Sequence, residues 1–230
     1  MRYGEEVIHF GLTRTGRKSL AISVLPDLSV VVTAPNGSPL ELVRQKVRKR
    51  APWILKQQDY FKAYLPKQPP RLYVSGETHL YLGRQYRLKV FETDAESVKL
   101  KGGYIHVGVN DKTGNDRVRS LLDGWLVMRA RAQFESRLDA CWVRLRKQGV
   151  PRPTLRLRRM RKRWGTCTRG GVIYLTPGLV KAPGSCIDYV IVHELCHLKH
   201  PHHGKAFYEM LRRVLPDWEQ RKARLEKVNI

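Results

Sequence analysis

Alternation of apolar and polar residues dominates the first part of the chain. It runs over residues 20–24 and again over 30–32, and a proline-aspartate pair separates the two stretches. This period of two around a turn sequence predicts a β-hairpin. Ser38 and Pro39 then have the residue types favoured at the N-cap and first position of a helix, and we expect Pro52 to break or kink that helix.

The middle of the chain returns to alternation after a proline-rich break. Residues 66–70, PKQPP, cannot continue a helix and indicate a connection between two sections. Short alternating stretches, the first over residues 72–74, then follow one another as far as residue 109, with glycine-containing turns between them. This pattern predicts an antiparallel sheet.

Helical spacing of apolar residues governs residues 116–147. It predicts one long helix, or two in line, which Gly149 and the prolines that follow it bring to an end. Residues 154–161 and 171–175 then predict two short strands around a turn.

Composition and charge narrow the class of protein. The 230 residues, 42% of them hydrophobic, suit a folded protein of one large domain or two small ones. Lys and Arg total 44 against 20 Asp and Glu, a net charge of +24, so anionic partners are expected. No apolar run approaches the roughly 18 residues that a membrane-spanning helix needs, and the N-terminal residues lack the apolar stretch of a signal peptide. We therefore expect a cytoplasmic protein without a membrane segment. The four cysteines form no C-x-x-C pair and are expected to be reduced.

The stretch with the most specific chemical content is H-E-x-x-H at His193, Glu194 and His197. It lies in an apolar segment that Ser185 and Asp188 are expected to cap, so a helix runs through both histidines. Residues four apart share a helical face, and both histidines can therefore hold one zinc ion. Glu194 lies beside this row, where a carboxylate can take a proton from water.

Catalytic zinc needs a third protein ligand and one open position. His203 is the best candidate, because its distance from the motif matches the metzincin spacing, with His200 at the usual glycine position. His200 and His202 are alternatives, as are the carboxylates Glu209 and Glu219. A purely structural zinc is also conceivable, but the glutamate inside the motif and the lack of an obvious fourth ligand favour an open site.

Several motifs carry a resemblance to a known family. They are R-W-G-T-C at Arg163 to Cys167, G-V-I-Y-L at Gly171 to Leu175, I-D-Y-V-I-V-H-E-L-C-H-L at Ile187 to Leu198, H-H-G-K-A-F at His202 to Phe207, P-D-W at Pro216 to Trp218 and, more weakly, S-G-E at Ser75 to Glu77 and Y-L-G-R at Tyr81 to Arg84. In these motifs the chain resembles the YgjP-like family of predicted zinc metallopeptidases, relatives of the SprT and Wss-type proteases. That family has Asn-His-Ser at residues 202–204, and the resemblance implies that His203 is the third zinc ligand.

The resemblance also implies the fold. We expect an α+β protein with a zincin-like metallopeptidase core, in which the active-site helix packs on a small mixed sheet, and an N-terminal β-rich extension. Residues 1–65 are expected to form an N-terminal hairpin and basic helix, residues 66–110 an antiparallel β section, and residues 111–230 the zincin-like catalytic domain.

These observations predict a zinc-dependent hydrolase, most specifically a metallopeptidase that acts on a peptide or protein, with Zn²⁺ as cofactor and Glu194 as general base. One alternative is a metal-dependent hydrolase of an anionic small molecule such as a nucleoside triphosphate. Another is a polyanion-binding protein with an inactive metal site. Basic runs at residues 44–50 and 156–163 are consistent with nonspecific nucleic-acid binding and equally with solvated faces. The sequence leaves the oligomeric state open.

Some features around the motif have two interpretations. The strand over residues 172–175 is either an edge that binds an extended peptide or an ordinary internal strand. Trp164-Gly165 is either an ordinary core residue and turn or part of the pocket wall near the metal, and the resemblance to the family favours the wall. An oxyanion donor is needed, and Tyr189, Tyr208 and His202 are candidates that no spacing rule separates.

Overall fold

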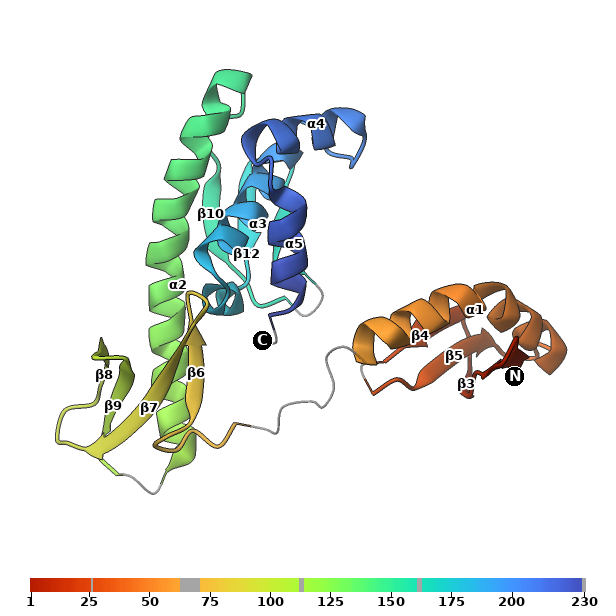
Figure 1. Cartoon of the computed structure of the whole chain (residues 1–230), viewed down its shortest axis with the longest axis horizontal. Helices are drawn as coiled ribbons and strands as arrows, with labels where there is room; N and C mark the ends of the chain where they lie inside the picture. Colours follow the sequence, from red (N-terminus) through yellow and green to blue (C-terminus); the bar gives the residue numbers. More distant parts are fainter. Residues whose placement is uncertain (26, 63–70, 112–113, 161–162, 229–230) are drawn as a thin grey trace. The chain divides into compact units, whose positions relative to one another are not determined.

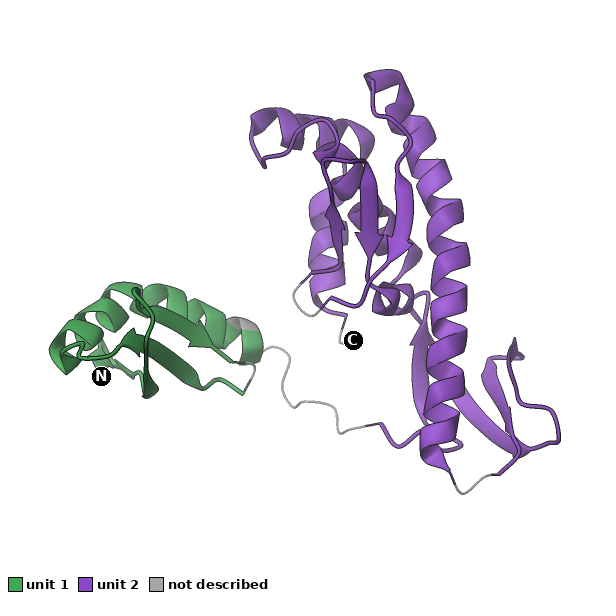
Figure 2. Ribbon diagram, turned by 180° about the vertical axis from the view of Figure 1, so that it is seen from behind, with its two compact units in different colours: residues 1–69 green, residues 70–230 purple. Residues whose placement is uncertain are grey.

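The computed structural model describes residues 1–25, 27–62, 71–111, 114–160 and 163–228. Within these residues the protein is α+β, with five α-helices and four small β-sheets (Figure 1). The chain forms two compact units, Met1–Pro69 and Pro70–Ile230 (Figure 2). The predicted connection at residues 66–70 lies outside the described residues.

The elements have the following bounds. The strands are β1 (Arg2–Tyr3), β2 (Glu6–Val7), β3 (Phe10–Thr15), β4 (Ala21–Val24), β5 (Val30–Pro35), β6 (Thr78–Tyr81), β7 (Arg84–Glu92), β8 (Ser97–Lys101), β9 (Tyr104–Val109), β10 (Thr154–Leu157), β11 (Gly165–Cys167) and β12 (Val172–Leu175). The α-helices are α1 (Leu40–Lys62), α2 (Asn115–Leu145), α3 (Gly184–His197), α4 (Lys205–Val214) and α5 (Trp218–Glu226), and the 3-10 helices are η1 (Arg146–Gln148) and η2 (Pro177–Lys181).

The first unit contains a three-stranded sheet in the order β3-β5-β4. The predicted hairpin is confirmed, because β4 pairs antiparallel with β5 from Ala21↔Thr33 to Val24↔Val30. Strand β3, which the pattern did not predict, pairs parallel with the other side of β5. Buried and half-buried residues alternate along the central strand β5, because successive side chains point to opposite faces of the sheet.

Helix α1 packs against this sheet through one apolar stripe. Val43, Val47, Ala51 and Ile54 are fully buried in one cluster with residues of β5. Their spacing of three and four residues keeps them on one face of the helix. Of the predicted break or kink at Pro52, the break is wrong, because α1 continues to Lys62. Proline has no N–H group to donate to the carbonyl oxygen of Arg48, four residues earlier. Both residues are exposed, so water can bind this carbonyl oxygen instead.

The second unit begins with a four-stranded sheet in the order β6-β7-β9-β8. The antiparallel prediction is correct for β6 with β7 and for β8 with β9, but wrong for the central pair, because β7 and β9 are parallel. Strand β8 pairs with the far side of β9, so the chain crosses over before it returns. Alternation reports which side chains share a face and carries no information about strand direction. Residues 72–74 form no strand, and Tyr73 has φ 59°.

Helix α2 is the single long helix that the apolar spacing predicted, and it ends at η1 and Gly149, which has φ 79°. Its buried side includes Trp125, Phe134 and Leu138. These belong to one hydrophobic core that extends from the four-stranded sheet to α3 and α4. Residues 71–110 and the C-terminal part thus share a core. In the described part of the chain, no helix is long and apolar enough to cross a bilayer.

A second, three-stranded sheet lies in the order β10-β12-β11 and is mixed. The prediction of two strands around a turn is incomplete, since β10 and β12 are parallel neighbours and β11 lies between them in the sequence. The edge interpretation of residues 172–175 is wrong, because β12 is the central strand with partners on both sides. The edge strand next to α3 is β11, the shortest of the three.

His79 on β6 is buried, and its Nε2 lies 3.2 Å from Oε2 of Glu77. Burial, and secondarily the charge of Arg71, lower the pKa of His79 below the ordinary value of 6.5, although Glu77 opposes the shift. The unfolded chain therefore binds more protons than the folded chain once the pH falls below about 6.5. We expect the contribution of His79 to the free energy of unfolding to be largest above about pH 6.5 and to decrease as the pH is lowered.

Urea unfolding of the wild type and of His79→Gln measures this contribution. Both proteins are unfolded at about pH 8 and at about pH 5, with a chelator present. The variant is expected to lose less stability on acidification than the wild type. An identical loss in both proteins would show that His79 does not contribute.

Candidate metal centre

Helix α3 is anchored at its first turn by α2. Nη1 of Arg137 donates hydrogen bonds to the carboxylate of Asp188 at 2.8 Å and to the carbonyl oxygen of Gly184 at 3.2 Å. The predicted Ser185 cap is wrong: the helix begins at Gly184, and the N-cap residue Pro183 makes no side-chain capping bond. Asp188 pairs with an arginine of another helix, a contact that local sequence does not reveal.

A β-turn of the four-stranded sheet supports the loop that leads into α3. The backbone N–H groups of Leu82 and Gly83 donate to the carbonyl oxygens of Val180 and Lys181, at 2.9 and 3.0 Å. Gly83 has φ +76°, and a Cβ built on it would lie 2.7 Å from Pro183. A side chain there would therefore push the start of α3 away. This contact gives a physical reason for the glycine in the Tyr81 to Arg84 motif.

Three histidine side chains converge at the other end of α3. His193 and His197 lie one turn apart on the helix, and their ring centroids are 4.9 Å apart. His203 comes from the connection to α4 and places its Nε2 3.0 Å from Nε2 of His193. One ring nitrogen from each residue lies within 4.8 Å of the others, and no other such group of three occurs among the described residues. The alternatives His200, His202, Glu209 and Glu219 lie outside this cluster.

The chemistry of these nitrogens fits a divalent metal such as zinc. Nδ1 of His197 lies 3.1 Å from the carbonyl oxygen of His200, an outer hydrogen bond that leaves Nε2 for the cluster. Nδ1 of His193 is buried and has no hydrogen-bond partner among the described residues. Burial, with the neighbouring His197 and His203, lowers the pKa of His193 to about 4. A neutral imidazole is the form that binds metal, and a set of three nitrogens suits zinc.

Phe207 of α4 packs under the cluster, a role that sequence reasoning did not assign. Its fully buried ring lies 5.0 Å from that of His193 and 4.7 Å from those of His197 and His203, between centroids. The H-H-G-K-A-F motif contains this residue and was the available signal. By filling the space behind the imidazoles, Phe207 limits their rotation.

Glu194 is 6% exposed and lies against the backbone of β11. A Cβ built on Gly165 would lie 2.8 Å from Oε1 and 2.9 Å from Cγ of Glu194, so only glycine allows this approach. The assignment of Trp164-Gly165 to the wall near the metal motif agrees with this geometry. Burial raises the pKa of Glu194 to about 7, while the charge of Arg163 opposes the shift. A carboxyl group with such a pKa exchanges protons readily near neutral pH.

Aromatic side chains of α3, α4 and α5 line the histidine cluster. The ring of Tyr189 lies 5.9 Å from His193 and stacks on Trp218, whereas Tyr208 lies 6.1 Å from His203 and is 37% exposed. Both tyrosines are thus near the cluster, as an oxyanion donor must be, and His202 is exposed. The four cysteines form no disulfide in the structure.

The described residues thus define an α+β protein with a helix-borne histidine cluster beside a buried glutamate. The family model described as "YgjP-like, metallopeptidase domain" matches residues 18–228, nearly the whole chain. The chain therefore belongs to the YgjP-like metallopeptidase family, and the resemblance inferred from its motifs is confirmed.

The crystal structure of the metallopeptidase zymogen of Pyrococcus abyssi abylysin matches with 24% sequence identity and a TM-score of 0.37; the match covers 40% of this chain and 90% of that one. A search of curated proteins gives no match.

Proposed function

We propose that the protein is a zinc-dependent metallopeptidase with a zincin-like core. The observation that carries the proposal is the convergence of one ring nitrogen each from His193, His197 and His203 within 4.8 Å, beside the buried carboxylate of Glu194. Membership of a metallopeptidase family agrees with it. Three nitrogen ligands leave a fourth zinc position open, which catalysis requires.

Zn²⁺ held by the three histidines would supply a Lewis acid that lowers the pKa of water and polarises a carbonyl group. Glu194 accepts the proton of the attacking water at a carboxylate oxygen and later delivers it to the leaving amine. The backbone of β11 holds that carboxylate in place through the contact at Gly165. Tyr189 or Tyr208 donates to the developing oxyanion.

The edge strand β11 offers a place for the substrate. It pairs with β12 on one side and has no partner on its other side within the described residues. An extended peptide that added to this edge would pass beside Glu194, because Gly165 of β11 contacts that residue. This geometry favours a peptide or an unfolded protein segment over a compact small molecule.

His203→Ala tests the ligand set. Loss of one of three ligands is expected to lower the zinc content from about one ion per chain and to abolish hydrolysis of an unfolded protein. His202→Ala is the matched control, because it removes the adjacent exposed histidine, which lies outside the cluster. Zinc content by mass spectrometry and peptide release by gel electrophoresis measure both effects.

Each other outcome points to a different conclusion. Loss of zinc in His202→Ala rather than His203→Ala would show that the third ligand is misassigned. Turnover of nucleoside triphosphates without peptide cleavage would support the small-molecule hydrolase. Bound zinc without turnover of unfolded protein, peptides or nucleotides would contradict the peptidase and support a binding protein with an inactive metal site.

A further inference from the structure

Helix α1 has two basic flanks beside its buried stripe, and they differ in their surroundings. Lys46, Lys49, Arg50 and Trp53 recur at intervals of three and four residues and therefore share one flank. Arg44 and Arg48 follow buried positions by one residue, which places them on the opposite flank. All five cations on these two flanks are exposed, so the helix presents charge on both sides.

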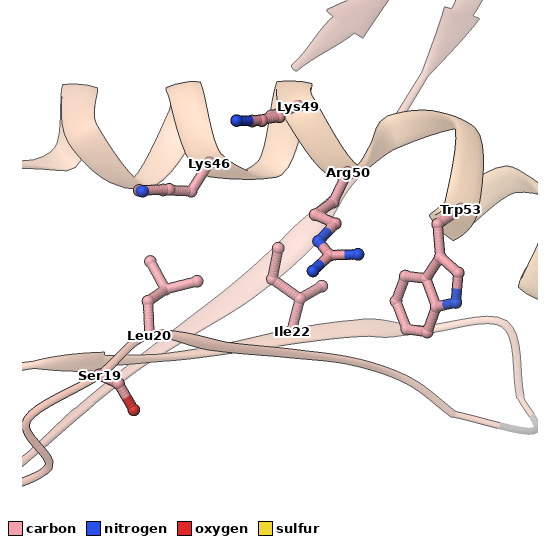
Figure 3. Close-up of a pocket in the computed structure, with 7 residues that line it drawn as sticks. All are labelled: Ser19, Leu20, Ile22, Lys46, Lys49, Arg50 and Trp53. Carbon is pink, nitrogen blue, oxygen red and sulfur yellow. The ribbon is translucent and has the colours of Figure 1, made fainter. Parts of the chain in front are cut away.

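The first flank forms one wall of a groove beside β4. This groove, here called the α1–β4 groove, has a volume of about 900 Å³. It is lined by Ser19, Leu20, Ile22, Lys46, Lys49, Arg50 and Trp53. Figure 3 shows Lys46, Arg50 and Trp53 on the side of α1 that faces Leu20 and Ile22. Because β4 is an edge strand, this groove lies at the open margin of the sheet.

The charge in the α1–β4 groove has one sign. Among the described residues that line it, three carry cationic side chains and none carries a carboxylate. Within the described residues, none of Lys46, Lys49 and Arg50 forms an ion pair, whereas Arg44 on the other flank lies 3.8 Å from Glu41. The second flank borders another cavity, which contains Glu41 as well as Arg44 and Arg48. The α1–β4 groove is therefore the one suited to a ligand with several negative charges.

Trp53 decides which anionic ligand fits. Its indole is 40% exposed at a basic groove with a partly apolar floor. The Asp and Glu side chains of an acidic peptide would satisfy the cations, but they carry no flat ring to cover the indole. A single strand of nucleic acid supplies both phosphates for the cations and bases that stack on an aromatic ring. In a duplex the base faces are already stacked and cannot do so.

We propose that the α1–β4 groove binds single-stranded nucleic acid without sequence preference. Lys46, Lys49 and Arg50 contact successive phosphates, and a base stacks on Trp53. Leu20 and Ile22 form the apolar floor under the sugar and base edges. The groove belongs entirely to the first unit and works independently of the histidine cluster.

The test uses the full-length protein and a fluorescent oligothymidylate of about 20 nucleotides in an anisotropy titration. Trp53→Ala is expected to weaken binding by roughly five- to a hundred-fold, whereas Trp53→Phe retains most of the affinity. Binding of a duplex is expected to be equal in wild type and Trp53→Ala. Thermal melting of each variant checks that the fold is retained, which we expect because Trp53 is exposed.

Two double variants of equal net charge distinguish binding in the α1–β4 groove from nonspecific attraction of nucleic acid to a protein of net charge +24. Lys46→Gln with Arg50→Gln is expected to reduce the slope of log affinity against log salt by about 1.4, which corresponds to two phosphates. Arg44→Gln with Arg48→Gln removes the same charge from the other flank and is expected to leave the slope near that of wild type.

Three results would overturn the proposal. The first is equal losses in the two double variants, which would indicate nonspecific attraction. The second is wild-type affinity for the single strand in Trp53→Ala. The third is tighter binding of a polyglutamate peptide that depends on the same residues, which would identify an acidic protein as the partner.

Discussion

Glu194→Gln is expected to lower kcat for peptide hydrolysis by roughly 100- to 10,000-fold while the protein keeps its zinc. Glutamine has nearly the same shape as glutamate and can occupy the buried space against β11, but it cannot accept the proton of the attacking water. The carboxylate lies outside the histidine cluster, so the three nitrogens remain in place. Steady-state kinetics and zinc analysis of the same preparation measure the two quantities together.

Glu209→Gln is the control for this prediction. Glu209 lies on α4, is exposed and is only weakly paired with Lys205, at 3.9 Å. Its substitution is expected to leave kcat and zinc content near wild type. Loss of zinc in Glu209→Gln would favour the carboxylate-ligand alternative, and full activity of Glu194→Gln would exclude Glu194 as the general base.

Gly165→Ala is expected to reduce activity by about 100-fold, because the added methyl group displaces the carboxylate of Glu194 or the strand itself. A Cβ at this position would lie 2.8 Å from Oε1 of Glu194 and 3.0 Å from Cγ1 of Val190. Overpacking of this kind costs about 1–3 kcal/mol in the free energy of unfolding. Kinetics and urea unfolding measure the two effects, and zinc content should stay unchanged.

Gly170→Ala in the connection between β11 and β12 is the matched control. The nearest atom to a Cβ built there is Oγ1 of Thr168, at 3.9 Å, so the methyl group has room. Its activity and stability are expected to match wild type. Wild-type activity in Gly165→Ala would show that the contact between β11 and Glu194 is not required for hydrolysis.

The elements with strong local periodicity could be predicted from the sequence. The apolar spacing over residues 116–147 predicted α2, and alternation around a proline-aspartate pair predicted the β4–β5 hairpin. Strand direction could not be predicted, because alternation is the same in parallel and antiparallel sheets. The parallel pairs β7 with β9 and β10 with β12 depend on crossovers that only the folded chain defines.

The start of α3 shows the limit of local rules. Ser185 and Asp188 have the residue types of a capping motif, yet Asp188 accepts a hydrogen bond from Arg137, which lies 51 positions earlier in the chain. An ion pair with a neighbouring helix replaces the local cap. The spacing of the two histidines on this helix was unaffected, because that depends on helical pitch alone.

The sequence by itself determined that His193, Glu194 and His197 lie together, because histidines four positions apart in an α-helix lie on one face, and Glu194 is next to the first of them. Tertiary structure decided how these residues are enclosed. It brings His203 to within 3.0 Å of His193, packs Phe207 under the imidazoles and sets β11 against Glu194. Such contacts join α3 to other elements of the chain. They depend on tertiary packing, which the spacing of residues within one helix does not encode.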